Sequence, residues 1–181
     1  MWDLPVRVEI DGAYYNIRNK CDYRVVLDVI KALSDEELTQ QQKIKCSLYI
    51  FYEDLKGLKN YKAAVEEMLK IINIGEKEDE RQEEKPKMMD WEFDMPRLAP
   101  PISRVLGYSV RGDTYTHWYD FIGAYMEIGE CLFANIISVR SKRMRGKRLD
   151  KQEQEFYENN KKIIDLPGMF TADELAWLDE E

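Results

Sequence analysis

The sequence predicts a mainly α-helical bundle with a short N-terminal β-hairpin. Three observations carry this prediction. Strict apolar alternation is confined to the first residues, and apolar residues recur at three- and four-residue steps through most of the rest. Glycines, prolines and capping residues separate these stretches. A chain of 181 residues is also long enough to bury one sizeable core.

Residues 6–17 alternate as a two-stranded hairpin requires. Val8 is expected to face Tyr15 across a turn at Asp11-Gly12. This dipeptide suits a type I′ turn, because both central residues need positive φ. A lone hairpin is only marginally stable in water, so its apolar face is expected to pack against the helices that follow.

Helical periodicity accounts for the next stretch of chain. It predicts a first helix over residues 22–33, a second from a Ser34–Glu37 capping box to Gly57, and a third over residues 58–75. Pro96, Pro100 and Pro101 then predict a short helical turn, a break, and a helix from Pro101 to Leu106. The remaining predicted helices begin at a cap or after a glycine: after Asp113, after Gly129, at Asp150 with Glu153, and at Thr171 with Glu174.

Residues 75–87 carry no apolar side chain except the proline ring, so ordering them would cost chain entropy with little return. This predicts a charged flexible linker, and a charged interaction tail is the alternative. The linker divides the chain into a hairpin and three-helix half, residues 1–74, and a helical half, residues 88–181, that carries His117 and Trp118. The two halves together are expected to form one composite domain.

Composition excludes several classes of function. A net charge of −8 favours solubility and disfavours unspecific binding to nucleic acid or an anionic membrane. The three cysteines, Cys21, Cys46 and Cys131, form no CxxC pair, and the single histidine of the chain cannot complete an ordinary zinc site with them. They are therefore expected to be reduced, partly buried thiols. No run of about 18 apolar residues and no signal-peptide pattern occurs, which predicts a cytoplasmic protein. No phosphate-binding glycine loop occurs, and no cofactor is expected.

His117 is the one candidate for acid–base catalysis, with Asp113 and Asp120 within reach on a helix. No nucleophile motif accompanies it, so we favour a structural imidazole near a helix N-terminus and expect no catalytic residue. Asp90 and Asp94 are a conceivable Mg²⁺ pair, but isolated carboxylate pairs are commonly solvated, and no metal site is expected.

Two groups of residues are candidates for protein binding. Trp91, Phe93 and Trp118 are large aromatic side chains of the kind that anchor interfaces, although such residues also fill cores. The second group belongs to a basic run with six cations in nine residues: Arg140, Lys142, Arg143, Arg145, Lys147 and Arg148. The run is either a patch for an acidic partner or a helix C-terminus that continues into a solvated loop. A protein partner is favoured over nucleic acid, because the run has no aromatic side chain to stack on bases.

Three pieces of the sequence together resemble a known family. They are Asp90-Trp91-Glu92-Phe93-Asp94, the run Thr116-His117-Trp118-Tyr119-Asp120-Phe121, and the basic segment that begins Ile137-Ser138-Val139-Arg140. In this order and spacing they resemble the gene product fifteen family of small proteins from long-tailed phages and prophages of Gram-positive bacteria. The resemblance is strongest from Asp90 to Leu166, and the three prolines after Asp94 depart from it.

The resemblance implies a role in tail assembly, because such proteins are typically encoded between the major tail protein and the tape-measure protein. It implies a non-enzymatic chaperone of the host cytoplasm that binds the tape-measure protein and is absent from the mature virion. The major tail protein is a second expected partner, and self-association is left open. The alternatives are a structural minor tail or connector protein of the virion, and an enzyme centred on His117.

Overall fold

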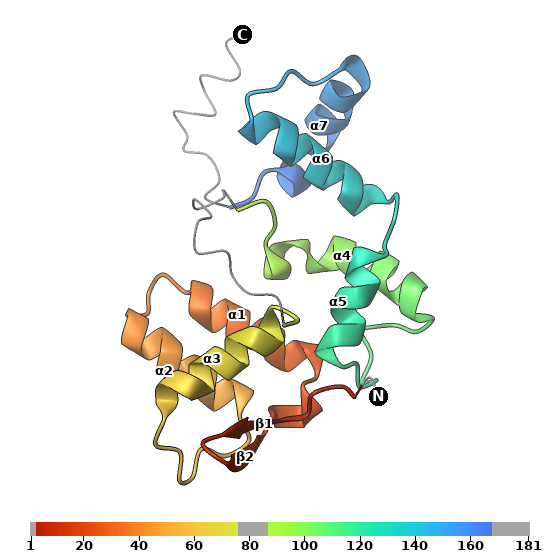
Figure 1. The fold of residues 1–181 in the computed structure, drawn as a ribbon. Coiled ribbons are helices and arrows are strands. Elements are labelled where there is room, and N and C mark those ends of the chain that lie inside the picture. The colour runs from red at the N-terminus through yellow and green to blue at the C-terminus, as the bar shows by residue number, and fades with distance from the viewer. Residues whose placement is uncertain (1–2, 76–86, 168–181) are drawn as a thin grey trace. The chain divides into compact units, whose positions relative to one another are not determined.

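The computed structural model describes residues 3–75 and 87–167, in which seven α-helices follow a two-stranded antiparallel sheet (Figure 1). The predicted fold class is therefore confirmed. None of the helices in these two ranges combines the length and the apolar character that a membrane crossing needs. The predicted helix at Thr171 and all but the two ends of the predicted linker lie outside the described residues.

The chain divides into two compact units, which do not follow the sequence halves. Among the described residues, unit 1 holds 3–75 and 112–124, and unit 2 holds 87–111 and 125–167. His117 and Trp118 therefore lie in unit 1, whereas the sequence analysis placed them in the second half.

Unit 1 begins with a hairpin of β1 (Arg7–Ile10) and β2 (Ala13–Asn16). Val8 pairs with Tyr15 as predicted, and Asp11 and Gly12 have φ values of 50° and 79°. Positive φ at both positions is the geometry expected for a type I′ turn. On the apolar face the Tyr15 ring meets the Tyr52 ring edge-on with 6.4 Å between centroids. Tyr52 directly follows one helix, and its hydroxyl donates to the Ala64 carbonyl of another.

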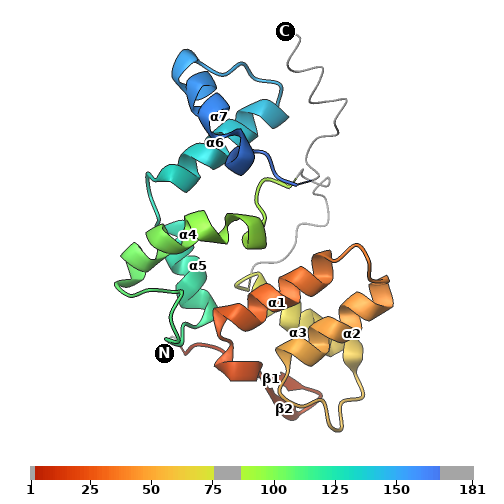
Figure 2. The same cartoon turned by 180° about the vertical axis from the view of Figure 1, so that it is seen from behind.

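Three helices lie beside the hairpin in both views (Figures 1 and 2): α1 (Tyr23–Ser34), α2 (Gln40–Phe51) and α3 (Tyr61–Ile72). The second helix is shorter than predicted at both ends. The predicted Ser34–Glu37 capping box is wrong, because Ser34 is the last residue of α1. The reciprocal bonds are made instead by Thr39 and Gln42, and they start α2 one turn later.

Helix α5 (Trp118–Met126) begins later than its predicted cap at Asp113. The residues before it run alongside the start of α1. Tyr23 N–H donates to the Thr116 carbonyl and Trp118 N–H donates to the Cys21 carbonyl, each at 2.9 Å. These backbone groups are therefore satisfied between segments, and they do not need a helical turn.

Unit 2 contains α4 (Trp91–Leu106), α6 (Leu132–Met144) and α7 (Lys151–Ile164). The predicted Asp150–Glu153 capping box is confirmed at the start of α7. Helices α6 and α7 pack through a buried cluster of Ile136, Val139, Tyr157 and Ile164. Three partly buried residues pack against this cluster: Leu149, Phe156 and Ile163.

The predicted break at the prolines is wrong, because α4 is one helix of 16 residues. Proline at position 100 removes the N–H that would bond to the Pro96 carbonyl. The guanidinium of Arg111 supplies that bond instead, with its Nη2 at 2.8 Å from the Pro96 oxygen. A side chain 15 residues away thus replaces a missing backbone donor.

We expect the Arg111 bond to matter only while position 100 is proline. Arg111→Ala should lower the free energy of unfolding by about 1 kcal/mol in the natural chain, because it leaves the Pro96 carbonyl without its donor. In a Pro100→Ala background the new N–H can make the helical bond, so the same change should cost clearly less. Urea unfolding of the four proteins in this cycle measures the difference. Equal costs in both backgrounds would contradict this account of the continuous helix.

Candidate functional site

The centre of unit 2 is a buried ion pair between Asp94 of α4 and Arg140 of α6. Nη1 and Nη2 of the arginine donate to the two carboxylate oxygens at 2.7 and 2.9 Å. Both side chains have 0% exposure. A buried charge pair is tolerated only when its remaining polar atoms are also satisfied.

The other three N–H groups of Arg140 all find carbonyl partners. Nη1 donates to Met88, just before α4, at 3.2 Å, and Nη2 donates to Ile163 at 2.9 Å. Nε donates to Ile164. The last two carbonyls end α7 and would otherwise lack donors. All five guanidinium N–H groups are therefore used, and one side chain joins three helices.

The first turn of α4 is held by the carboxylates that the sequence marks as an acidic cluster. Asp90 accepts the Phe93 N–H at 2.8 Å, and Asp94 accepts the Asp90 N–H at 3.0 Å. Burial raises the pKa of the Asp90 carboxyl, but the bonds from the Lys87 ammonium and the Phe93 N–H outweigh burial and lower it. These carboxylates are occupied by donors of the chain itself. Among the described residues, no three metal-ligating side chains gather into a group.

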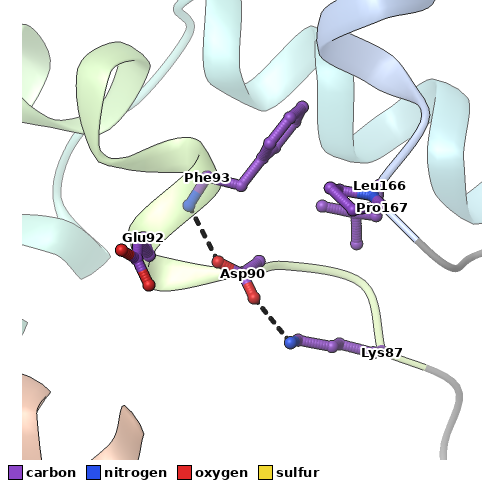
Figure 3. A pocket seen from close by; sticks show the side chains of 6 residues that line it. All are labelled: Lys87, Asp90, Glu92, Phe93, Leu166 and Pro167. Carbon is purple, nitrogen blue, oxygen red and sulfur yellow. Dashed lines mark hydrogen bonds and ion pairs between the residues drawn. The ribbon is translucent and has the colours of Figure 1, made fainter.

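A pocket of about 320 Å³ opens beside this turn (Figure 3). Phe93, Leu166 and Pro167 give it apolar surface, and Asp90, bonded to Lys87, gives it a polar side. Phe93 is half-buried, and the guanidinium of Arg97 lies 5.2 Å from its ring centroid. The structure therefore brings one of the predicted contact residues to the wall of an open pocket.

The other two aromatic candidates differ in their exposure to solvent. Trp91 is half-buried at the start of α4 and meets the Tyr125 ring edge-on, with 5.4 Å between centroids. Trp118 is a core residue with 2% exposure, and its indole N–H donates to the Ile72 carbonyl at 3.0 Å. Trp118 is therefore not available as a surface contact.

The cations of the basic run also differ in burial and in pairing. Arg140 is buried, Lys142 pairs with Glu153, and Arg143 pairs with Asp165 while lying 3.9 Å from the Tyr157 ring centroid. Arg145, Lys147 and Arg148 are exposed, and none of them forms an ion pair with another described residue. Half of the run is thus part of the packing of unit 2, and the other half faces solvent.

His117 lies in the core of unit 1 with 0% exposure. Its Nδ1 accepts the Tyr119 N–H at 3.0 Å, and its Nε2 is 3.1 Å from the Pro5 carbonyl oxygen. One nitrogen accepts a backbone N–H and the other faces a carbonyl oxygen, so the side chain caps α5. This agrees with the structural interpretation of the histidine.

The sequence did not predict the left-handed turn at residues 19–21. Asn19, Lys20 and Cys21 have φ values of 47°, 54° and 63°, and no glycine marks the turn. The Tyr115 hydroxyl donates to the Lys20 carbonyl at 2.8 Å, which joins the turn to the segment before α5. Such backbone persists only where its surroundings determine it. Burial raises the pKa of the Cys21 thiol to about 12, and its carbonyl bond to Trp118 belongs to the same junction.

A model of the bacteriophage Gp15 protein family matches residues 1–115, which is more than half of the 181 residues. The chain belongs to the bacteriophage Gp15 family. No curated protein and no solved structure matches it. The Gp15 match includes the hairpin, helices α1 to α4 and Asp94. It ends before His117 and Arg140, so those two features of the resemblance lie outside the matched residues.

We expect the buried pair of this Gp15-family chain to behave as one unit. Asp94→Leu or Arg140→Met alone should lower the free energy of unfolding by about 3–5 kcal/mol, because each leaves an uncompensated buried charge. The double variant should recover a large part of that loss. Urea unfolding of the cycle measures it, with Asp94→Asn as a milder substitute if a single variant does not fold. Additive losses in the double variant would contradict the pairing.

We also expect capping to be the main role of the His117 side chain. His117→Asn retains an acceptor for the Tyr119 N–H and His117→Ala does not, so the asparagine variant should be more stable by about 1 kcal/mol. Thermal unfolding of the two variants provides the comparison. Equal melting temperatures would argue against the capping role.

Proposed function

We propose that this Gp15-family chain is a tail-assembly chaperone that binds the tape-measure protein of its phage. The observation that carries the proposal is the family match over residues 1–115. The tail role is supported by the resemblance to proteins encoded beside tape-measure genes, which is an argument from analogy.

The surface of unit 2 is compatible with such a role. A tape measure is a long helical chain whose apolar stripes promote aggregation until they are covered. Trp91 and Phe93 offer half-buried aromatic surface in one turn of α4, beside the open pocket. The net charge of −8 would keep the complex in solution. We therefore retain Trp91 and Phe93 as contact residues and withdraw Trp118 and Arg140, which are buried.

The proposed activity is binding without catalysis. His117 supports this, because both of its ring nitrogens are engaged and its side chain is fully buried. The proposed place of action is the host cytoplasm during tail polymerisation, with the major tail protein as a second partner. The alternative is a structural minor tail or connector protein retained in the virion.

The deciding experiment is co-expression of this chain with the tape-measure protein of the same tail gene cluster. We expect the tape measure to become soluble and to co-purify with the chain. Trp91→Ala with Phe93→Ala should reduce recovery of the complex, because these changes remove aromatic contact area. Tyr49→Ala, which removes a 59% exposed aromatic side chain from unit 1, is the matched control and should leave recovery unchanged. Circular dichroism and urea unfolding establish that each variant is folded.

Two results would overturn the proposal. One is a tape measure that stays insoluble and forms no complex with the natural chain. The other is mass spectrometry of purified virions that finds the chain at a fixed ratio to tail subunits, which would favour the structural alternative.

A further inference from the structure

We propose that the loop between α6 and α7, residues 145–150, binds an Asp- and Glu-rich segment of a partner protein through Arg145, Lys147 and Arg148, here called the loop cations. This inference rests on the proposed function only where it identifies the partner as a tail protein. The acidic chemistry of the partner follows from the loop itself.

The first support is that neighbouring ion pairs leave these three charges free. Lys142 is neutralised by Glu153 and Arg143 by Asp165, so these two acidic groups are committed to the first half of the run. Asp150 lies within the loop, but its carboxylate accepts the N–H groups of Gln152 and Glu153, and these bonds lower its pKa. The loop therefore presents three exposed cations against the single carboxylate of Asp150, and none of the three forms an ion pair with it.

The second support is that the loop backbone is fixed at both ends. Lys147 N–H donates to the Lys142 carbonyl and Gly146 N–H to the Arg143 carbonyl, at 2.8 and 2.9 Å. With φ of 61° at Gly146, this is a Schellman motif that ends α6. The Asp150 capping box starts α7, and Leu149 packs against the buried cluster between them. A charged group on an ordered loop loses less entropy on binding than one on a flexible tail.

The third support is local charge. The described residues of unit 2 carry 13 Lys and Arg against 10 Asp and Glu, whereas those of unit 1 carry 11 against 14. Unit 2 therefore has a positive excess, although the chain as a whole is acidic. This charge distribution suits a short acidic segment better than a long polyphosphate. Exposed Glu155 and Glu158 on α7 would repel a duplex that extended along the helix, and the loop has no aromatic side chain to stack on bases.

The test is fluorescence anisotropy with the full chain at low salt. The probes are a labelled peptide of alternating Glu and Ser, a matching peptide with Lys in place of Glu, and a short DNA duplex. The test variant carries Arg145→Glu, Lys147→Glu and Arg148→Glu. The control carries Lys45→Glu, Lys56→Glu and Lys59→Glu, which makes the same charge change on exposed lysines of unit 1. Thermal unfolding checks both variants, because loop cations also favour the C-terminus of α6.

We expect the natural chain and the control to bind the glutamate peptide with similar affinity, and added salt to weaken that binding. The loop variant should bind it at least about tenfold more weakly and should gain affinity for the lysine peptide. Equal binding by the loop variant and the control would overturn the proposal. Tighter binding of DNA than of the glutamate peptide by the natural chain would replace it with a phosphate site. Neither result depends on the tape measure, so failure of the chaperone proposal is recognised separately.

Discussion

The buried contact between Asp94 and Arg140 is the constraint on which most of unit 2 depends. Removing two charges from water costs more than their attraction returns unless every remaining donor and acceptor is also bonded. Here Arg140 reaches Met88, Ile163 and Ile164, and Asp94 also accepts the Asp90 N–H. The bonds cannot be satisfied unless the start of α4 and the end of α7 both meet α6. The pair therefore fixes the register of three helices, and it places Phe93 and Leu166 at the same pocket.

Unit 1 uses a related device in a more exposed setting. Asp22 caps α1 by accepting the Arg24 N–H, and its carboxylate also accepts the Thr116 N–H at 3.2 Å. Arg24 balances the charge at 3.1 Å while its side chain remains 40% exposed. In both units a carboxylate at a helix start holds a segment far away in sequence. Since Arg24 keeps contact with water and Arg140 does not, we infer that the second unit relies more heavily on its ion pair.

Two local signals in the sequence predicted local structure, whereas the Ser34–Glu37 box did not, because Ser34 ends α1 and the box is made by Thr39 and Gln42. Asp11-Gly12 and the Asp150–Glu153 box act through neighbouring residues, and both appear as expected. Two other failures came from distant partners. Arg111 bridges the carbonyl that Pro100 leaves open, and the bonds of residues 116 and 118 to the start of α1 delay α5. Burial of Trp118 and Arg140 could not be predicted either, because an aromatic or basic residue has the same local pattern in a core as on a surface.

The basic run shows why charge counts alone misjudge a surface. Six cations in nine residues suggest one patch, yet Arg140 lies inside the protein and contributes no accessible charge. Lys142 and Arg143 are paired with acidic groups that close the α6–α7 packing. Their neutralisation isolates Arg145, Lys147 and Arg148 on a backbone that the Gly146 motif holds in place. Salt screens exposed charges beyond about 10 Å, so the positive field of this loop acts only on groups close to it, although the chain as a whole is acidic. The loop can therefore attract a short acidic segment that comes within this distance, and a lower salt concentration extends that range.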